Sequence, residues 1–369
     1  MPWVVPSALE TAVYAAAERV VGRARLATPS LVAAITDRSR RYTSEREALG
    51  RPADPDGDLA ARAVFFTIAD ALKIAVPLDE LAARDALPAR RPLRVVDLGA
   101  GCGAMTLGLA ATCPELALDV LAIDRDPRAL EIARLAVQAF APAATIATRT
   151  ADATRAELPA ADLVVIGNML NELSPAHAIE VVGRALAAIA DDGAVIVIEP
   201  ALRDTARGLH AIRDAVIARG LGHVAAPCTR HGAPCPALAD PGDWCHEDRA
   251  LQLSPRTAEL ARLTHLRDSG MKFAYLVLRR APLDLVAAGD RAWRIVSAPI
   301  PAKGKLEIFG CSAHGRVPLR LLKRHRSADN RALERVDRGD VVVVDDAPDD
   351  ARVEIRGPVT VVTPRRDRS

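Results

Sequence analysis

The sequence predicts an α/β fold built on a mostly parallel sheet that helices cover on both faces. From Arg94 onward, short β-branched runs alternate with amphipathic helical patterns, and this alternation is typical of a covered parallel sheet. A glycine-rich turn follows the first run, and acidic residues follow the next two. Together these observations predict a nucleotide-type cofactor site at the carboxyl edge of the sheet.

Residues 1–90 are predicted to form a helical N-terminal region. Apolar residues recur there at helical spacing, and a polar stretch rich in Pro and Asp, residues 51–58, interrupts them with a loop. The start of the chain has no basic segment leading a long apolar run, so we expect neither a signal peptide nor a transit peptide. No apolar stretch approaches the roughly 20 residues that span a bilayer. We therefore expect a cytoplasmic protein without a membrane partner.

The parallel sheet is expected within residues 91–282. Its first, second, fourth and fifth predicted strands cover residues 94–98, 118–123, 162–166 and 194–198, and a third strand precedes Asp152. A later pair near residues 246–251 and 272–278 would close the sheet as an antiparallel edge. Beyond Pro282 the pattern shifts to short strands, which predicts a small β-rich C-terminal domain over residues 283–369.

Three glycines, Gly99, Gly101 and Gly103, lie between the first strand and a helix. Glycine permits the tight turn and lets a ligand approach the backbone closely. The spacing also fits the dinucleotide fingerprint, in which a pyrophosphate rests on the helix N-terminus. Asp97 precedes the glycines, and its carboxylate would repel a pyrophosphate but suits the cationic amino-acid part of S-adenosylmethionine. The loop therefore favours a methyl-donor site.

Polar residues follow the next strands where a methyl-donor site requires them. Asp124 ends the second strand, where a carboxylate can accept hydrogen bonds from both ribose hydroxyls. Asp152 follows the third strand, where it can meet the adenine amino group. Either acid alone is equally well explained as a strand-end or helix-cap residue. Asn168, after the fourth strand, is expected to line the cofactor or acceptor pocket. The combination resembles the class I methyltransferase superfamily over residues 91–280, which implies a Rossmann-like sheet and bound S-adenosylmethionine.

The sequence identifies no catalytic base or nucleophile. Asn171 and Glu172 are better explained as a cap and a solvent-facing residue of the next helix than as catalytic groups. Glu199, after the fifth strand, is a further candidate for the rim of the site. Sequence patterns therefore leave the catalytic residues unassigned.

Four cysteines predict a metal site. Cys228, Cys235 and Cys245 fall within eighteen positions in a loop, residues 226–249, and Cys311 follows far downstream. The loop has too few apolar residues to make ordinary buried thiols a good explanation. Four thiolates hold either tetrahedral zinc or a cubane iron–sulfur cluster, and the spacing does not decide between them. A nucleophilic cysteine is disfavoured, because in cytosine-5 RNA methyltransferases the Pro-Cys element directly follows the fourth strand.

Several short motifs between residues 95 and 311 match one known family. They are Asp97-Leu-Gly-Ala-Gly-Cys-Gly103, Asn168-Met-Leu-Asn-Glu-Leu173, Ala-Pro-Cys228, Pro-Cys235-Pro, Trp-Cys245-His, Lys272-Phe-Ala-Tyr-Leu-Val-Leu278 and Gly-Cys311. In these motifs the chain resembles a mitochondrial small-ribosomal-subunit protein family with animal methyltransferase-like and bacterial members.

This resemblance implies three further properties of the chain. It implies a four-iron, four-sulfur cluster on Cys228, Cys235, Cys245 and Cys311, whereas the spacing alone leaves zinc as the alternative. It also implies binding of S-adenosylmethionine and association with small-subunit rRNA during assembly.

Basic residues concentrate in the C-terminal domain. Residues 291–338 contain twelve Arg or Lys against four Asp or Glu, whereas residues 1–90 contain twelve of each. A phosphate backbone is expected to bind this segment, although a solvated basic face explains such a run equally well in isolation. Aromatic residues make up only 3% of the chain, so we expect contacts to phosphate and shape rather than to stacked bases.

The sequence thus predicts a cytoplasmic, ribosome-associated protein that binds S-adenosylmethionine, an iron–sulfur cluster and small-subunit rRNA. No DNA partner is expected. One alternative is an active rRNA methyltransferase with Asn168 near the acceptor. A second alternative is an RNA-binding protein that zinc stabilises or that senses iron or redox state.

Overall fold

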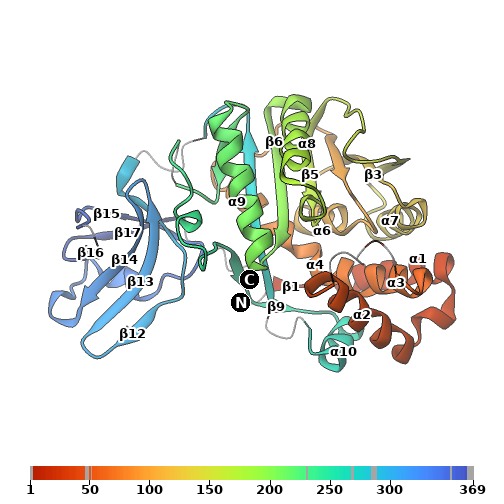
Figure 1. Cartoon of the computed structure of the whole chain (residues 1–369), viewed down its shortest axis with the longest axis horizontal. Coiled ribbons are helices and arrows are strands. Elements are labelled where there is room, and N and C mark those ends of the chain that lie inside the picture. The colour runs from red at the N-terminus through yellow and green to blue at the C-terminus, as the bar shows by residue number, and fades with distance from the viewer. Residues whose placement is uncertain are drawn as a thin grey trace.

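A mixed sheet of eight strands forms the centre of the molecule (Figure 1). The computed structural model describes residues 3–45, 50, 52–229, 232–266, 270–283, 289–349 and 351–363. The strand order is β4-β3-β2-β5-β6-β10-β7, with β8 also paired to β10. The strands are β2 (Leu93–Leu98), β3 (Leu118–Asp124), β4 (Thr145–Thr150), β5 (Ala161–Gly167), β6 (Ile189–Pro200), β7 (His223–Ala226), β8 (Glu247–Arg249) and β10 (Met271–Arg279).

The pairing directions identify the fold. Strands β2 to β6 are parallel, and β10 runs antiparallel to β6 and to β7. A parallel sheet with one antiparallel strand inserted beside its last member is the arrangement of class I methyltransferases. The predicted fold class is therefore confirmed.

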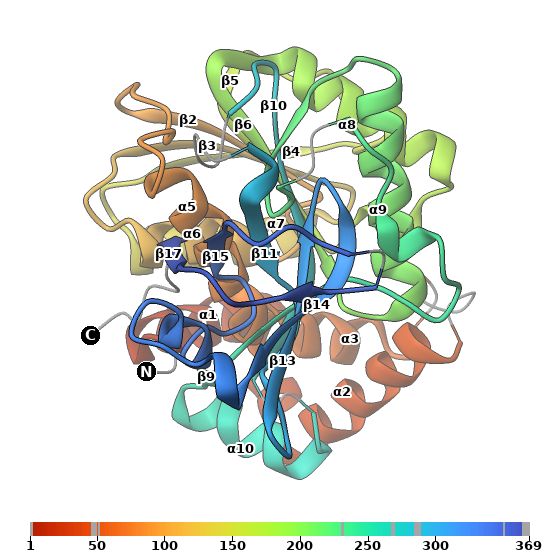
Figure 2. The same ribbon diagram turned by 90° about the vertical axis from the view of Figure 1, so that its left-hand side faces the viewer.

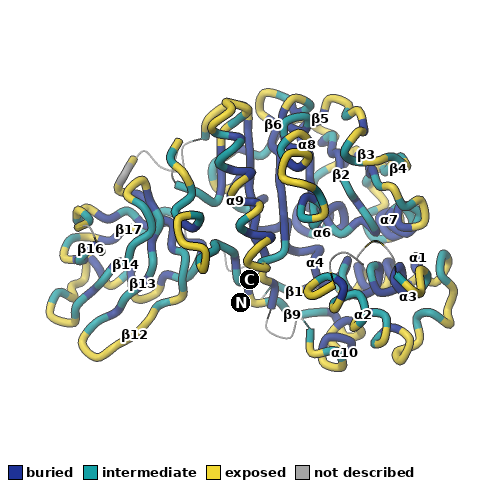
Figure 3. The backbone as a smooth tube through the Cα atoms, in the orientation of Figure 1, coloured by how far each residue is buried: buried dark blue, intermediate teal, exposed yellow. Residues whose placement is uncertain are grey.

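Helices cover both faces of this sheet, and Figure 3 shows that its strands are largely buried. Alternate residues of β2 enter different cores, since Val95 packs with one hydrophobic cluster and Val96 with another. The first cluster includes α6 (Ala104–Thr112) and α7 (Pro127–Phe140). The second includes α8 (Pro175–Ala188) and α9 (Arg203–Ala218). The β-branched strands and the apolar helix stripes thus complete two separate cores.

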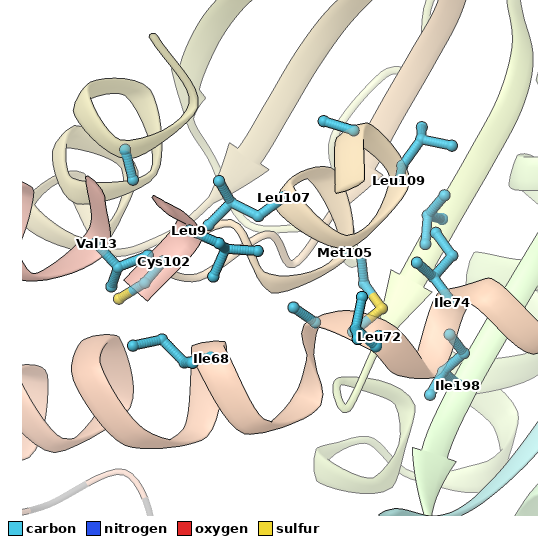
Figure 4. Close-up of a cluster of buried hydrophobic side chains, with 14 of the residues drawn as sticks. Leu9, Val13, Ile68, Leu72, Ile74, Cys102, Met105, Leu107, Leu109 and Ile198 are labelled. Atoms are coloured by element: carbon cyan, nitrogen blue, oxygen red, sulfur yellow. The ribbon is translucent and has the colours of Figure 1, made fainter. Parts of the chain in front are cut away.

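A layer of N-terminal helices packs against α6 and α7. Figure 4 shows Leu9 and Val13 of this layer close to Ile68, Cys102 and Leu107 in a shared apolar core. The layer contains α1 (Ser7–Val21), α2 (Thr28–Thr43), α3 (Pro55–Ala61), a π-helical segment (Arg62–Thr67), α4 (Ile68–Asp70) and α5 (Ala75–Ala82).

A later segment of the chain joins this helical layer. Helix α10 (Pro255–Thr264) packs on α2, and β1 (Trp3–Val4) pairs with β9 (Leu251–Gln252). The buried carboxylate of Glu10 accepts hydrogen bonds from Ser254 Oγ at 2.7 Å and from Thr257 N at 2.8 Å. Glu10 therefore satisfies a free backbone amide at the start of α10. No described helix has both the length and the apolar character needed to cross a membrane.

The C-terminal part forms a second sheet around its own core, as the β-rich prediction required (Figures 1 and 2). Its order is β16-β14-β13-β11-β15-β17, with β12 paired to β13, and all pairs except β14 with β16 are antiparallel. The strands are β11 (Ala292–Ile295), β12 (Ile300–Ala302), β13 (Lys305–Ser312), β14 (Gly315–Leu322), β15 (Val341–Val344), β16 (Val353–Glu354) and β17 (Val359–Thr363).

Candidate functional site

The glycine loop lies between β2 and α6 and needs glycine at two positions. Gly99 has φ of 75°, and a Cβ there would lie 2.6 Å from Sδ of Met169. Gly103 has φ of 86°, and its Cβ would lie 3.0 Å from Cβ of Ala133. Both the backbone conformation and the close packing therefore exclude a larger side chain. Glycine at these positions lets the loop pack closely against Met169 and Ala133.

A cavity of about 510 Å³ opens beside this loop at the carboxyl ends of the strands. Among the predicted cofactor residues, its lining includes Gly99, Gly101, Asp124, Asp152 and Asn168. The structure thus brings these five residues from four separate segments into one space. Such a cavity is large enough for a small-molecule cofactor.

Asp97 and Gly103 are not among the lining residues of this cavity. The carboxylate of Asp97 is only 1% exposed and accepts hydrogen bonds from Thr106 Oγ1 at 2.7 Å and Thr106 N at 3.2 Å. Burial raises the pKa of Asp97 to about 6, although these hydrogen bonds oppose the shift. Its Oδ1 has no hydrogen-bond partner among the described residues. Asp97 therefore fixes the first turn of α6 behind the loop.

Asp124 and Asp152 meet the cavity from the ends of neighbouring strands. Asp124 Oδ2 accepts a hydrogen bond from Gly101 N at 2.8 Å, so the carboxylate also holds the glycine loop. Asp152 Oδ1 accepts from Thr154 N at 2.8 Å and Thr154 Oγ1 at 2.7 Å. These bonds lower the pKa of Asp152. Both acids are thus fixed in position at the cavity edge.

Asn168 lies at the end of β5 in a left-handed conformation, with φ of 55°. Its Nδ2 donates to Asp70 Oδ2 at 3.1 Å. Its buried Oδ1 has no partner among the described residues. A side chain held in this sparsely populated conformation, with an unused acceptor beside the cavity, is typical of a ligand-contacting position.

The N-terminal helices supply cavity residues that sequence patterns did not identify. Arg62, Phe66 and Asp70 line the space, and the first two belong to the π-helical segment. Arg62 Nη1 lies 2.8 Å from Asp126 Oδ2. Burial alone would lower the pKa of Arg62, but nearby acidic groups, Asp124 among them, raise it. A π-helical turn is frequent at functional sites, although no sequence signal marks this one.

A hydrogen-bonded chain runs beside the cavity from Glu199 to α2. Glu199 accepts from Leu170 N at 2.8 Å and from Asn171 Nδ2 at 2.6 Å. Tyr42 Oη in turn donates to Asn171 Oδ1 at 3.1 Å. Burial raises the pKa of Glu199 to about 7. Asn171 therefore bridges two layers of the protein. The predicted cap role of Asn171 is wrong, because the N-cap of α8 is Ser174.

The four predicted metal ligands, Cys228, Cys235, Cys245 and Cys311, line one cavity of about 60 Å³. None of the four is joined in a disulfide with another described residue. Burial raises the pKa of Cys235 to about 11, and burial together with the neighbouring thiols raises the pKa of Cys245. Among the described residues, no group of three or more His, Cys, Asp or Glu side chains is arranged to hold a metal ion. Metal binding therefore stays a prediction.

Side chains of α9 form hydrogen bonds with the loop of residues 226–249, which we call the cysteine loop. Arg207 Nη1 donates to three loop carbonyls, those of Ala237 at 2.7 Å, Asp240 at 2.6 Å and Asp243 at 2.7 Å. One turn later, His210 Nε2 accepts from Cys245 N at 3.0 Å. The helical spacing of these residues was visible in the sequence, but their target was not.

The C-terminal domain closes the cysteine cavity. Thr229 Oγ1 donates to the Cys311 carbonyl at 2.9 Å. Arg338 Nη1 donates to the His246 carbonyl at 3.0 Å, and Arg316 pairs with Asp243. Several basic residues of the 291–338 segment thus join the two domains and do not face solvent freely. Those that remain exposed are Arg291, Lys303, Lys323, Arg324, Arg326, Arg331 and Arg335.

The strand order and the glycine-loop cavity define a protein with the class I methyltransferase fold. The family model described as "Mitochondrial small ribosomal subunit Rsm22" matches residues 64–342. The chain therefore belongs to this family, and the recognition made from the motifs is confirmed. The family description is mitochondrial, so the cytoplasmic location stays a prediction.

Solved methyltransferase structures are similar at low identity. Magnesium protoporphyrin IX methyltransferase from Synechocystis, solved with S-adenosylmethionine, is 12% identical over 66% of this chain and 95% of that chain, with a TM-score of 0.37. An O-methyltransferase family protein from Burkholderia thailandensis is 18% identical over 68% and 72%, with a TM-score of 0.36.

A third structure is phosphoethanolamine N-methyltransferase 1 from Haemonchus contortus, with S-adenosylhomocysteine. It is 22% identical over 44% of this chain, with a TM-score of 0.28, and the matched part spans 32% of that protein. No curated protein matches the sequence significantly.

Proposed function

We propose that this protein binds S-adenosylmethionine, a four-iron, four-sulfur cluster and small-subunit rRNA, and acts in assembly of the small ribosomal subunit. The observation that carries the proposal is the glycine-loop cavity with Asp124, Asp152 and Asn168 at its edge, in a member of a small-subunit family. A methyl donor and a ribosomal partner account for both features together.

The residues of the glycine-loop cavity fit the methyl donor. Asp124 offers a carboxylate for ribose hydroxyls, and Asp152 offers one for the adenine amino group. The unused oxygen of Asn168 supplies a further acceptor. Six acidic residues line this cavity against three arginines, and this balance suits a cofactor that carries a sulfonium and an ammonium group better than one that carries a pyrophosphate. The bound cofactor would supply an activated methyl group.

The donor set of the cysteine cavity fits an iron–sulfur cluster. Four thiols from separate segments surround a shared space, and soft thiolate ligands select iron–sulfur clusters, zinc or copper. A cubane, with one iron for each cysteine, needs ligands spread around a larger body. Cys228, Cys235, Cys245 and Cys311 would hold it and would join the two domains.

The exposed basic residues of the C-terminal domain support an rRNA partner. Lys323 and Arg324 are exposed at the end of β14, and Lys323 N donates to the Gly304 carbonyl at 2.9 Å. That pairing puts the exposed Lys303 in the same turn region. A group of unburied cations on one domain attracts phosphate backbones and makes binding depend on salt.

Metal, sulfide and cofactor analysis of one preparation tests this function. Protein purified without oxygen should contain about four irons and four sulfides per chain, and should bind S-adenosylmethionine in titration calorimetry. Stoichiometric zinc with no iron would refute the cluster and support the zinc alternative. Failure to bind S-adenosylmethionine would refute the cofactor assignment independently of the metal.

Methyl transfer to rRNA is a second candidate function, because a separate open cleft adjoins the cofactor cavity at Leu173. Loss of one rRNA methyl group in a deletion strain, restored by the wild-type chain but not by Gly101→Asp, would support it. Unchanged rRNA methylation with defective subunit assembly would favour the assembly role alone.

A further inference from the structure

The order of the strands gives each part of the proposed methyl donor a place in the cavity. The carboxyl edge of the sheet runs β4-β3-β2-β5, with Asp152 after β4, Asp124 at the end of β3 and Asn168 after β5. The glycine loop follows β2. If Asp152 receives the adenine and Asp124 the ribose, the amino-acid end of the donor lies over the glycine loop. That end carries a carboxylate and an ammonium group, and both lose solvation unless the cavity supplies polar partners.

The backbone of the glycine loop is largely unavailable to the carboxylate. Gly99 N and Ala100 N donate to the Ile123 carbonyl at 2.8 and 3.0 Å. Gly101 N donates to Asp124 Oδ2 at 2.8 Å. These three amides are therefore used inside the protein, and a side-chain cation is the stronger partner for a carboxylate.

Three arginines line the cavity, and two of them are unsuited to this role. Arg38 Nη1 contacts both oxygens of Asp58 at 3.0 Å, so its charge is matched within the protein. The side chain of Arg125 is 75% exposed and lies 3.6 Å from Glu172, so a carboxylate bound there would compete with water. The side chain of Arg62 is only 23% exposed. Arg62 is therefore the cation that the cavity shields best for a ligand.

Arg62 directs unused donors toward the glycine loop. Its Nη1 donates to Asp126 Oδ2 at 2.8 Å, whereas Nε and Nη2 donate no hydrogen bond among the described residues. Nη2 lies 3.6 Å from the point where a Cβ on Gly101 would lie, and no second described atom outside the adjacent residues lies within 4 Å of that point. The Nε and Nη2 groups form the fork with which a guanidinium binds both oxygens of a carboxylate.

The position of Arg62 is fixed from two sides. The next three residues of the π-helical segment, Ala63, Val64 and Phe65, are each 0% exposed in the core. Asp126, which holds Nη1, is itself fixed as the N-cap of α7 through two backbone amides. A cation that is already held in place loses little conformational freedom when it binds a ligand.

We propose that Arg62 binds the α-carboxylate of S-adenosylmethionine, so that the cavity selects a donor with an intact amino-acid end. The proposal rests on the proposed function in one respect, which is the identity of the cofactor. An RNA phosphate is the competing anion. The six acidic residues that line the cavity disfavour a phosphate diester, which brings a net negative charge, whereas the carboxylate arrives with an ammonium group beside it.

Titration calorimetry of the full-length protein with three ligands isolates the carboxylate. S-adenosylhomocysteine carries a carboxylate and an ammonium group, its decarboxylated form keeps only the ammonium group, and 5′-methylthioadenosine has neither. We expect the wild type to bind S-adenosylhomocysteine more tightly than the decarboxylated form. Arg62→Met should weaken S-adenosylhomocysteine binding roughly tenfold to a hundredfold, the loss expected for charge-assisted hydrogen bonds. It should not weaken the binding of the other two ligands.

Two further variants supply the controls. Arg125→Met removes a cation from the same cavity and should leave the ratio of the affinities for S-adenosylhomocysteine and its decarboxylated form unchanged. Arg62→Lys keeps the charge but has no planar fork, so it should recover only part of the S-adenosylhomocysteine affinity. Unchanged binding of 5′-methylthioadenosine to each variant controls for folding.

Four outcomes would overturn the proposal. Equal weakening of S-adenosylhomocysteine and its decarboxylated form in Arg62→Met would show that Arg62 only supports the loop. The same loss in Arg125→Met, or a wild type that does not distinguish the two ligands, would remove the specific role of Arg62. Loss of affinity for a small-subunit rRNA transcript, with S-adenosylhomocysteine binding kept, would assign the fork to phosphate.

Failure of this proposal is distinguishable from failure of the proposed function. A wild type that binds none of the three ligands refutes the cofactor assignment and the role of Arg62 together. A wild type that binds S-adenosylhomocysteine, with Arg62→Met binding it equally well, refutes the role of Arg62 alone.

Discussion

Arg294 of the C-terminal sheet donates from Nη1 to Oε1 of Glu80 on α5 at 2.6 Å, and both side chains are shielded from solvent. Arg84 pairs with the other oxygen of Glu80 at 2.8 Å, and Arg294 Nε donates to the Pro227 carbonyl at 2.8 Å. Burial alone would raise the pKa of Glu80, but the two guanidinium groups lower it. The buried pair of Glu80 and Arg294 thus joins the helical layer, the cysteine loop and the C-terminal domain.

Arg294→Met should destabilise the protein strongly. The substitution removes one cation from a buried carboxylate, and breaking such a pair typically costs about 3–5 kcal/mol. Arg84 stays beside Glu80, so we expect the lower end of that range. Urea unfolding followed by intrinsic fluorescence measures the loss.

Arg291→Ala is the matched control for Arg294. Arg291 pairs with Asp345 at 2.7 Å, but both side chains are more than half exposed. An exposed pair contributes at most about 1 kcal/mol, so this variant should unfold close to the wild type. Equal losses in the two variants would contradict a special role for the buried pair.

Asp124→Asn should weaken binding of S-adenosylmethionine about tenfold, because an amide offers fewer acceptor sites to the ribose hydroxyls and weakens the bond to Gly101 N. Asp119→Asn is the control, since Asp119 lies near the other end of β3 and accepts a hydrogen bond from Thr145 Oγ1 at 2.8 Å, away from the cavity. Calorimetry with both variants measures the difference. Unchanged affinity in Asp124→Asn would remove Asp124 from the cofactor site.

Arg207→Met should loosen the cysteine loop and reduce the iron content of anaerobically purified protein by at least about half. The substitution removes four hydrogen bonds from a charged donor to loop carbonyls, each worth roughly 1.5–3 kcal/mol. Among the described residues, Arg203→Met, one turn earlier on α9, removes a largely exposed pair with Asp204. Iron release to a chelator should accelerate in the first variant alone, and the same rate in both would argue against this role.

The sequence predicted the parts of the structure that depend on local pattern. β-branched runs predicted the strands β2, β3, β5 and β6, and the glycines at 99 and 103, where the structure has positive φ, marked the cofactor loop. Ends of parallel strands meet at one edge of a sheet, so the strand pattern alone was enough to predict that Asp124 and Asp152 lie together.

Contacts between distant segments were not predictable in the same way. Arg62 reaches the glycine loop only because the helical layer packs on α6 and α7, and nothing near residue 62 encodes that packing. From the sequence, Asp97 was predicted to contact the cofactor. Its burial behind the loop depends on the packing of β2 against Thr106, and the local sequence does not show that packing. Arg207 and His210 showed helical spacing, but their partners lie in a loop about 30 residues away.

Glu199→Gln should lose less folding stability than the wild type does when the pH rises. The pKa of Glu199 is about 7 in the folded protein and 4.5 as an ordinary value. Burial therefore disfavours the ionised form of Glu199. The stability that the protonated side chain contributes is complete below pH 4.5 and is lost as the pH rises to about 7. Glutamine cannot ionise, and between pH 5 and pH 8 the variant should gain on the order of 2 kcal/mol relative to the wild type.

Ionisation of Asp97 also lowers the free energy of unfolding as the pH rises, since its folded pKa of about 6 exceeds its ordinary value of 3.8. The gain of Glu199→Gln should therefore persist in an Asp97→Asn background. In that double variant the free energy of unfolding should change even less between pH 5 and pH 8. Urea unfolding at the two pH values measures each slope. Parallel curves for the wild type and Glu199→Gln would mean that Glu199 is already ionised in the folded protein near pH 5, and that burial does not control its titration.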